Sequence, residues 1–126
     1  GDALARAAVR RDKWESVLSS FWAPSIYAFT YACEHGGSSL RARMFAPAMG
    51  ITEDPATGAA VTALAGYLAP RAAERDGTLR WVVEQGFEMG RPSVLEVEAD
   101  LEAGGVVAIR VGGAAVFVSS GEIDVP

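Results

Sequence analysis

The spacing of hydrophobic and polar positions predicts one helix at the start of the chain and another near its middle. From Asp2 to about Leu18, apolar residues recur at roughly helical intervals, with arginines and acidic residues on the other side. The alanine-rich stretch from Gly58 to Ala73 has small side chains that can pack closely on all sides. We therefore expect an amphipathic helix on the surface and a second helix that is buried.

Strand patterns fill most of the remaining chain. Ser25 to Cys33 is β-branched and aromatic and ends in a Gly/Ser turn, whereas Leu40 to Ala46 alternates in polarity, so the two predict a hairpin with a half-buried second strand. Met49 to Thr57, rich in Gly, Pro and acidic residues, is predicted as a loop. Four more strands are predicted downstream: Leu79 to Val83, Ser93 to Ala99, Val106 to Val111 and Ala114 to Val118.

This order of elements predicts the fold class. One buried helix and about six strands indicate an α+β domain in which a mixed sheet curls around a central helix. The chain has 126 residues, of which 50% are hydrophobic and 21% charged, so it fits one folded domain spanning residues 1–126.

Composition and charge exclude several classes of partner. A net charge of −5 with scattered basic residues gives no electrostatic footprint for nucleic acid. The apolar stretch from Gly104 to Val118 is interrupted by Arg110 and by glycines, so no membrane span is predicted. One cysteine and one histidine exclude an internal disulfide and a multi-thiolate metal site, and a cytoplasmic location is expected. The chain begins at Gly1, without a methionine and without the basic-then-apolar pattern of a signal peptide, so we expect the gene product to begin elsewhere.

The turn before the buried helix carries the candidate chemistry. Asp54 or Thr57 can cap this helix, and Gly58 lets a ligand approach the backbone closely. A helix start leaves N–H groups unpaired and carries a partial positive charge, which suits a substrate carboxylate or phosphate. Asp54 beside it is placed for proton transfer. The alternative is that Asp54 and Thr57 only cap the helix, as such residues commonly do.

Other chemically reactive or aromatic residues have simpler interpretations. Cys33 ends a predicted strand and is expected to be structural, and His35 lies in a Gly/Ser loop and is expected to be solvated. Arg43 and Arg91 each either pair with groups of the chain or meet a substrate carboxylate. Core packing is expected to account for all three tryptophans, Trp14, Trp22 and Trp81.

Three ordered motifs carry a family resemblance. Arg43 to Pro47, followed by Gly50 to Gly58, resembles the signature of the PhzF family of the diaminopimelate-epimerase-like superfamily. Gln85-Gly86 with Met89 to Ser93 is similar to the second C-terminal signature of that family, and Val111 to Gly121 is similar to its closing hairpin.

The resemblance implies a two-lobed isomerase or epimerase. Each lobe is a strongly curved sheet wrapped around one helix, the active site lies between the lobes, and this chain resembles the C-terminal lobe only. A glutamate of the N-terminal lobe moves the proton without a cofactor. On this side the resemblance implies one catalytic residue, Asp54, and four that bind a small carboxylate substrate: Thr57, Gly58, Ala59 and Arg43.

Two departures from the family pattern limit this expectation. Ala59 stands where the family commonly has serine, which removes a hydroxyl donor and should weaken carboxylate binding by about 1 kcal/mol. The N-terminal lobe is missing, so the chain alone is expected to be inactive until a lobe on the same gene product or on another chain completes it. A homodimer is expected. The alternative is a non-catalytic domain that binds small carboxylates or self-associates.

Overall fold

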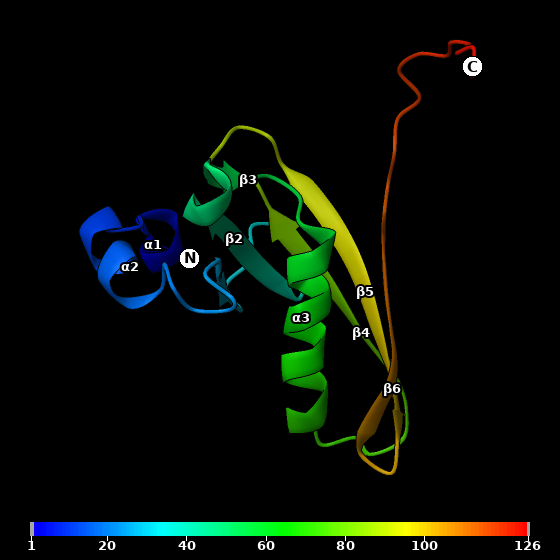
Figure 1. Cartoon of the computed structure of the whole chain (residues 1–126). Coiled ribbons are helices and arrows are strands. Elements are labelled where there is room, and N and C mark those ends of the chain that lie inside the picture. Colours follow the sequence, from blue (N-terminus) through cyan, green and yellow to red (C-terminus); the bar gives the residue numbers. More distant parts are fainter. Residues whose placement is uncertain (1, 126) are drawn as a thin grey trace.

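The computed structural model describes residues 2–125, in which a six-stranded mixed sheet carries one main helix on a single face (Figure 1). The helices are α1 (Asp2–Ala5), α2 (Arg11–Val17) and α3 (Gly58–Leu68), with short 3-10 helices η1 (Pro47–Met49) and η2 (Ala69–Arg71). The strands are β1 (Ile26–Thr30), β2 (Leu40–Ala46), β3 (Ile51–Asp54), β4 (Gly77–Gln85), β5 (Ser93–Glu102) and β6 (Gly105–Gly113). The predicted α+β class with a central helix is confirmed.

The strand order places the ends of β3 and β4 together. The order is β1-β2-β4-β5-β6, with β3 paired to β2 beside this path. One edge of β2 pairs in parallel with β4 from Leu40 to Ala42, and the same edge then pairs antiparallel with β3 through Met44 and Ala46. As a result, Gln85 at the end of β4 and Asp54 at the end of β3 lie next to each other. The sequence analysis predicted a loop where β3 forms.

The core lies between α3 and the sheet. Val61, Leu64 and Ala65 of α3 pack on buried strand residues such as Leu40 and Val83. The opposite side of α3 is exposed at positions spaced four apart, Ala59, Ala63 and Tyr67. The prediction of a helix buried on all sides is therefore wrong for the part of the chain that the structure describes.

The N-terminal segment forms two short helices, so the prediction of one continuous helix is wrong. The backbone carbonyls of Leu4, Ala5 and Ala7 accept hydrogen bonds from the guanidinium of Arg43, at 2.8–3.0 Å. A continuous helix would use these carbonyls for its own ladder. The long-range contact with Arg43 thus replaces the helical pattern that the local spacing favours.

The residues after β6 leave the sheet as an extended tail (Figure 1). The predicted strand from Ala114 to Val118 does not form, because no strand within residues 2–125 pairs with it. Val116, Phe117 and Val118 are each more than 80% exposed. Trp22 is 87% exposed, so the core position predicted for it is also wrong, whereas Trp14 is buried as expected.

Candidate functional site

The predicted site turn lies where β3, β4 and α3 meet. Thr57 precedes α3 in an extended conformation, and its side chain makes no capping hydrogen bond to the helix. Instead, its hydroxyl donates to the carboxylate of Asp54 and accepts a hydrogen bond from the side-chain amide of Gln85 at 3.0 Å. Thr57 therefore holds Asp54 and does not act as the simple helix cap that spacing alone favours.

Gln85 is the buried centre of this turn, and its side chain is 0% exposed. Its Nε2 donates to the carbonyl oxygen of Asp54 at 2.6 Å, and its Oε1 accepts from the hydroxyl of Tyr27 at 2.9 Å and from the N–H of Thr57 at 3.4 Å. Burial raises the pKa of Tyr27 well above its ordinary value, so this phenol remains a donor. All the polar atoms of the Gln85 amide are satisfied, which fixes the backbone on both sides of the turn.

The start of α3 remains open. Within residues 2–125, no hydrogen bond engages the N–H groups of Gly58, Ala59 and Ala60, and the first helical bond is from Val61 to the carbonyl of Thr57 at 3.1 Å. Ala59 is exposed to solvent. Free N–H groups and the helix dipole make this end attractive to an anion. The structure thus places Asp54, Thr57, Gly58 and Ala59 together.

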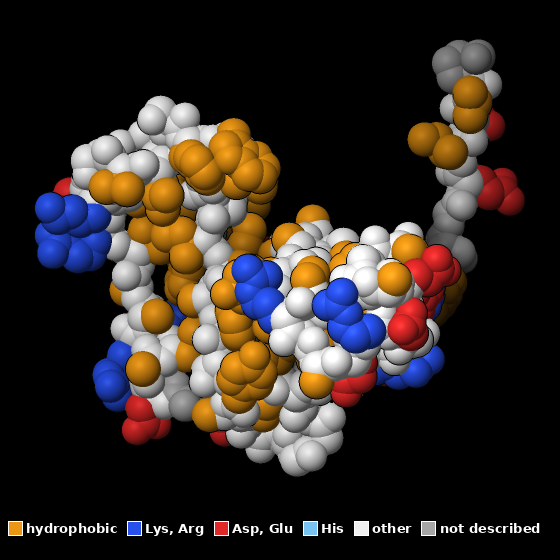
Figure 2. Space-filling view, turned by 90° about the horizontal axis from the view of Figure 1, so that it is seen from below, with side chains coloured by type: hydrophobic (Ala, Val, Ile, Leu, Met, Phe, Trp, Pro, Cys, Tyr) orange, Lys and Arg blue, Asp and Glu red, His pale blue; other side chains and the backbone are white. Residues whose placement is uncertain are grey.

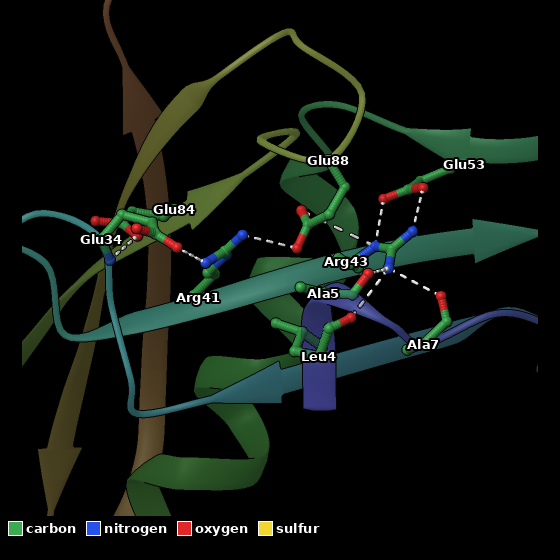
Figure 3. A network of polar contacts seen from close by, with 9 residues as sticks. All are labelled: Leu4, Ala5, Ala7, Glu34, Arg41, Arg43, Glu53, Glu84 and Glu88. Atoms are coloured by element: carbon green, nitrogen blue, oxygen red, sulfur yellow. Dashed lines mark hydrogen bonds and ion pairs between the residues drawn. The ribbon is translucent and has the colours of Figure 1, made fainter. Parts of the chain in front are cut away.

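Arg43 does not join them. The side chains of Leu40 and Ala42 face α3, so alternation along β2 directs Arg43 to the opposite face of the sheet. There its Nε and Nη2 contact the carboxylate of Glu53 at 2.8 and 2.7 Å, and its Nη1 binds the three N-terminal carbonyls (Figure 3). Every nitrogen of the guanidinium has a partner in the chain. Arg43 is therefore a brace for β3, and the substrate contact expected of it has no geometric support.

The same alternation separates two adjacent acidic residues. Met44 pairs with Asp54 in the sheet, so Asp54 points to the α3 side while Glu53 points to Arg43. The ion pair of Arg43 with Glu53, on the face of the sheet opposite α3, thus fixes β3, and β3 presents Asp54 on the α3 side. The sequence analysis singled out Asp54 as a candidate and gave Glu53 no role.

The face of β2 that points away from α3 carries charged side chains and is buried, as is the face toward α3. Arg41 contacts the carboxylates of Glu34 and Glu88, the latter at 2.8 Å (Figure 3). Its guanidinium also lies 5.5 Å from the centre of the Phe87 ring. Every residue of β2 is buried. The prediction of a half-buried strand is therefore wrong, because the arginines that suggest a solvent-exposed face are covered by acidic residues of three other segments of the chain.

Glu84, also on this face, is 0% exposed and fixes the loop between β1 and β2. Its carboxylate accepts N–H hydrogen bonds from Glu34 at 2.8 Å and His35 at 2.7 Å. Burial acts to raise the pKa of Glu84, but the hydrogen bonds from the loop outweigh it and hold the pKa below its ordinary value. The fold therefore stabilises the charged carboxylate.

Acidification is expected to weaken this loop through Glu84. Because its pKa is lower in the folded chain than the ordinary 4.5, its stabilising contribution is present above that pH and is lost as the pH falls through the folded pKa. A Glu84→Gln variant should lose about 1–3 kcal/mol of unfolding free energy near neutral pH, where the carboxylate accepts two N–H groups. Its stability should then fall less than that of the wild type on acidification. Urea unfolding at several pH values, with exposed Glu96→Gln as the control, measures both effects; parallel curves for wild type and Glu84→Gln would contradict the assignment.

The second motif forms a loop that packs on the turn. Gly86 has a φ of +81°, and a Cβ there would lie 2.8 Å from the carbonyl oxygen of Pro55. The N–H of Arg91 donates to the carbonyl of Gly86 at 3.0 Å, while the Arg91 side chain is exposed. This geometry favours a bracing role for Arg91, through its backbone.

Cys33 and His35 lie in or beside the loop that Glu84 holds. Burial and the charge of Glu84 raise the pKa of the Cys33 thiol, which disfavours the reactive thiolate. The His35 ring lies 5.5 Å from that of Phe87. Among residues 2–125, no group of three or more histidine, cysteine or acidic residues could hold a metal ion. No helix in this part of the chain is long and apolar enough to cross a membrane.

Comparison with known proteins identifies relatives of this chain. Residues 6–121 match the family described as phenazine biosynthesis-like protein, PhzC-PhzF. An uncharacterized isomerase of Mesorhizobium japonicum is 34% identical over 125 residues, which are 97% of this chain and 41% of that protein. The trans-2,3-dihydro-3-hydroxyanthranilate isomerase of Pseudomonas chlororaphis is 38% identical over 110 residues, which are 84% of this chain and 36% of that protein.

A solved structure shares the fold. The crystal structure of a Bacillus anthracis phenazine biosynthesis protein of the PhzF family matches with a TM-score of 0.78 and 27% identity, over 94% of this chain and 40% of that one. The chain therefore spans about two fifths of the length of its relatives. These matches confirm the resemblance found in the sequence motifs. The chain belongs to the PhzC-PhzF family of phenazine biosynthesis-like proteins.

Proposed function

We propose that this chain is the C-terminal half of a cofactor-independent isomerase, and that it supplies the carboxylate-binding side of an active site for proton transfer. The observation that carries the proposal is the open start of α3, where the N–H groups of Gly58 to Ala60 are free, beginning four residues after Asp54 at the end of β3. The buried amide of Gln85 keeps this turn in shape before any ligand arrives. Donors that are fixed in advance are what stabilises developing charge in a transition state.

The roles of the residues follow from their chemistry. A base removes a proton from a carbon of the substrate, and the electron pair delocalises toward the substrate carboxylate held at the start of α3. Asp54, kept in place by Thr57, exchanges a proton with a polar group of the substrate. The proton then returns to a carbon and completes the shift of a double bond or the inversion of a centre, with no net change in composition.

The base is proposed to come from outside this chain. The relatives are more than twice as long as the part that this chain matches, which leaves room for a second lobe carrying the glutamate that the family resemblance implies. We propose a cytoplasmic two-lobed enzyme, inactive as this chain alone, that acts on a small carboxylate. Since relatives in Pseudomonas are named trans-2,3-dihydro-3-hydroxyanthranilate isomerases, that compound is the first substrate to assay.

The test uses Asp54→Asn in a polypeptide that carries this chain with its complementing half. Asparagine keeps an oxygen that can accept the hydroxyl of Thr57 but cannot deliver a proton, so the turn should persist while catalysis fails. Incorporation of solvent deuterium into the substrate should fall by about 10²–10⁴-fold, the usual contribution of general acid–base catalysis. The melting temperature should remain within a few degrees of the wild type.

The opposite outcome supports a different function. Ala59 lacks the hydroxyl that the family commonly uses, and Arg43 lies on the wrong face to replace it. These features favour, as a second candidate, a non-catalytic domain that binds small carboxylates or self-associates. Unchanged exchange together with a large loss of stability in Asp54→Asn would reduce Asp54 to a structural residue and support this alternative.

A further inference from the structure

A chain of hydrogen bonds links β1 and β4 to the carboxylate of Asp54. It joins the side chains of Tyr27, Gln85, Thr57 and Asp54, in that order. Gln85, in the middle of the chain, is 0% exposed. The direction of each hydrogen bond follows from the chemistry of the groups at its two ends.

Two backbone groups fix which way round the side-chain amide of Gln85 lies. One end of the amide lies 2.6 Å from the carbonyl oxygen of Asp54, which can only accept a hydrogen bond, so this end must be the NH₂ group. The other end lies 3.4 Å from the N–H of Thr57, which can only donate, so this end must be the oxygen. The reverse orientation would place two acceptors together at one end and two donors at the other. Because Gln85 is fully buried, water could not relieve that mismatch.

The orientation of Gln85 determines the direction of the Thr57 hydroxyl. Nε2 of Gln85 lies 3.0 Å from Oγ1 of Thr57 and can only donate, so Oγ1 must accept there. The single proton of the hydroxyl is then left for Oδ2 of Asp54. On the other side of Gln85, Oε1 can only accept, so the hydroxyl of Tyr27 must donate to it at 2.9 Å. Every hydrogen bond of the chain thus runs in one direction, from Tyr27 toward Asp54.

The chain engages one oxygen of the Asp54 carboxylate and leaves the other free. Oδ2 accepts from Thr57, whereas no hydrogen bond within residues 2–125 engages Oδ1. The buried side-chain atoms without a partner in this part of the chain are Nε of Arg41 and Oε2 of Glu88, so Oδ1 of Asp54 is reached by solvent. A proton on Oδ2 would face the proton that Thr57 already donates to it. A proton that Asp54 exchanges is therefore carried by Oδ1.

Thr57 also lines a groove in which a substrate can lie. The groove, of about 570 Å³, lies between β1 and α3, and its walls include Tyr27, Thr57, Ala59 and Leu64. Figure 2 shows hydrophobic side chains gathered around a hollow between the N-terminal part and the body of the molecule. A substrate carboxylate needs hydrogen-bond donors, and the one proton of the Thr57 hydroxyl is already used by Asp54. The hydrogen bonds of Thr57 thus conflict with the substrate-binding role expected of its side chain.

We propose that Gln85 and Thr57 are positioning residues, which direct the Thr57 hydroxyl onto Oδ2 of Asp54 and leave Oδ1 as the oxygen that exchanges a proton with the substrate. The bond between Oδ1 and its proton breaks when the proton moves to a polar group of the substrate, and it forms again when the proton returns, so no other reactant is consumed. The chain orients Asp54 but does not conduct protons, because an amide would have to become an imidic acid to pass one on. The proposal rests on the proposed function, in which Asp54 exchanges this proton.

Three threonine variants test the proposal in the polypeptide that carries this chain with its complementing half, with trans-2,3-dihydro-3-hydroxyanthranilate as the substrate. Thr57→Val keeps the branched shape but removes the hydroxyl, so kcat should fall about 10–100-fold while KM stays within about threefold. Thr57→Ser restores the hydroxyl and should bring kcat to within about threefold of the wild type. Thr78→Val is the matched control, because the Thr78 hydroxyl donates to the carboxylate of Asp100 at 2.7 Å at the opposite end of β4 from Gln85. This control should change neither constant.

Nuclear magnetic resonance tests the direction of the hydrogen bonds without a substrate. The two protons on Nε2 of Gln85 have acceptors in the chain, the carbonyl oxygen of Asp54 and Oγ1 of Thr57, so both should be protected from exchange with water. One of the two signals should lose its downfield shift in Thr57→Val and regain it in Thr57→Ser. Thr78→Val should leave both signals in place.

The outcomes separate this proposal from the proposed function. A raised KM with unchanged kcat in Thr57→Val would make Thr57 a substrate-binding residue and overturn the positioning role. A kcat that Thr57→Ser fails to restore, or Gln85 signals that do not respond to Thr57→Val, would overturn it as well. Lost deuterium exchange in Asp54→Asn together with full kcat in Thr57→Val would overturn the positioning role alone, whereas full exchange in Asp54→Asn would overturn both proposals.

Discussion

Replacing Gly86 with alanine is expected to lower the free energy of unfolding by more than about 3 kcal/mol. This loss is the sum of the cost of a left-handed backbone at a residue with a Cβ and the cost of overpacking. Gly86 has a φ of +81°, and a Cβ would lie 2.8 Å from the carbonyl oxygen of Pro55 and in overlap with that of Arg91. Both obstacles are backbone atoms, which cannot yield as the end of a flexible side chain would. Urea denaturation followed by circular dichroism gives the free energy of unfolding.

Gly90 in the same loop provides the matched control. Its φ is +66°, but a Cβ there would have no atom within 4 Å. Gly90→Ala should therefore lower the free energy of unfolding only by the cost of the left-handed backbone, about 1–2 kcal/mol. The difference between the two variants reports how tightly the second motif presses on the Asp54 turn. Equal losses would show that this contact does not constrain the fold.

Arg43→Met is expected to lower the free energy of unfolding by about 3–5 kcal/mol, the usual effect of breaking a buried ion pair from one side. The methionine fills space but leaves Glu53 without its partner, and leaves the carbonyls of Leu4, Ala5 and Ala7 without their donor. Since the hydrogen bonds from Arg43 to these carbonyls hold the N-terminal segment against the sheet, α1 should detach in this variant. Urea unfolding measures the loss, and hydrogen exchange of residues 2–9 detects the detachment.

The comparison for Arg43 is Arg80→Met. Arg80 makes an ion pair of similar length with Glu98, at 2.8 Å, but its side chain is 68% exposed. Solvent screens such a pair, so Arg80→Met should change stability far less. Adding Glu53→Met to Arg43→Met should recover part of the loss, because the unpaired buried charge is then removed. Similar losses in Arg43→Met and Arg80→Met would contradict the bracing role of Arg43.

Local sequence patterns predicted the strands that pair with their neighbours in the chain. The meander of β4, β5 and β6 appears near its predicted positions, extended by one to three residues at most of its ends. The alternation of apolar and polar residues and the glycines at the turns are local features of the sequence, and they are enough to locate these strands. The helix from Gly58 was located for the same reason.

Features fixed by distant partners were not predictable. β3 reads as a Gly/Pro-rich loop and becomes a strand only because β2 offers it an edge. Arg41 and Arg43 suggest an exposed face of β2, until acidic residues from three other segments cover them. For the candidate site, the motif singled out Asp54 and Thr57, but the sequence analysis gave Gln85 no role. A glutamine at the end of a strand becomes informative only once its burial and its partners are known.

The parallel pairing of β2 with β4 determines when the site can assemble. Between the two paired strands the chain makes β3 and α3, so this pairing closes a much longer loop than the hairpins of the β4–β6 meander do. The bond between Tyr27 and Gln85 joins residues 58 positions apart, and that between Gln85 and Thr57 joins residues 28 apart. Contacts of such sequence separation form slowly during folding, after local ones. We therefore expect the Asp54 turn to take shape late in folding, and on a chain still emerging from the ribosome the hydrogen bonds of Gln85 cannot hold this turn until β4 is complete.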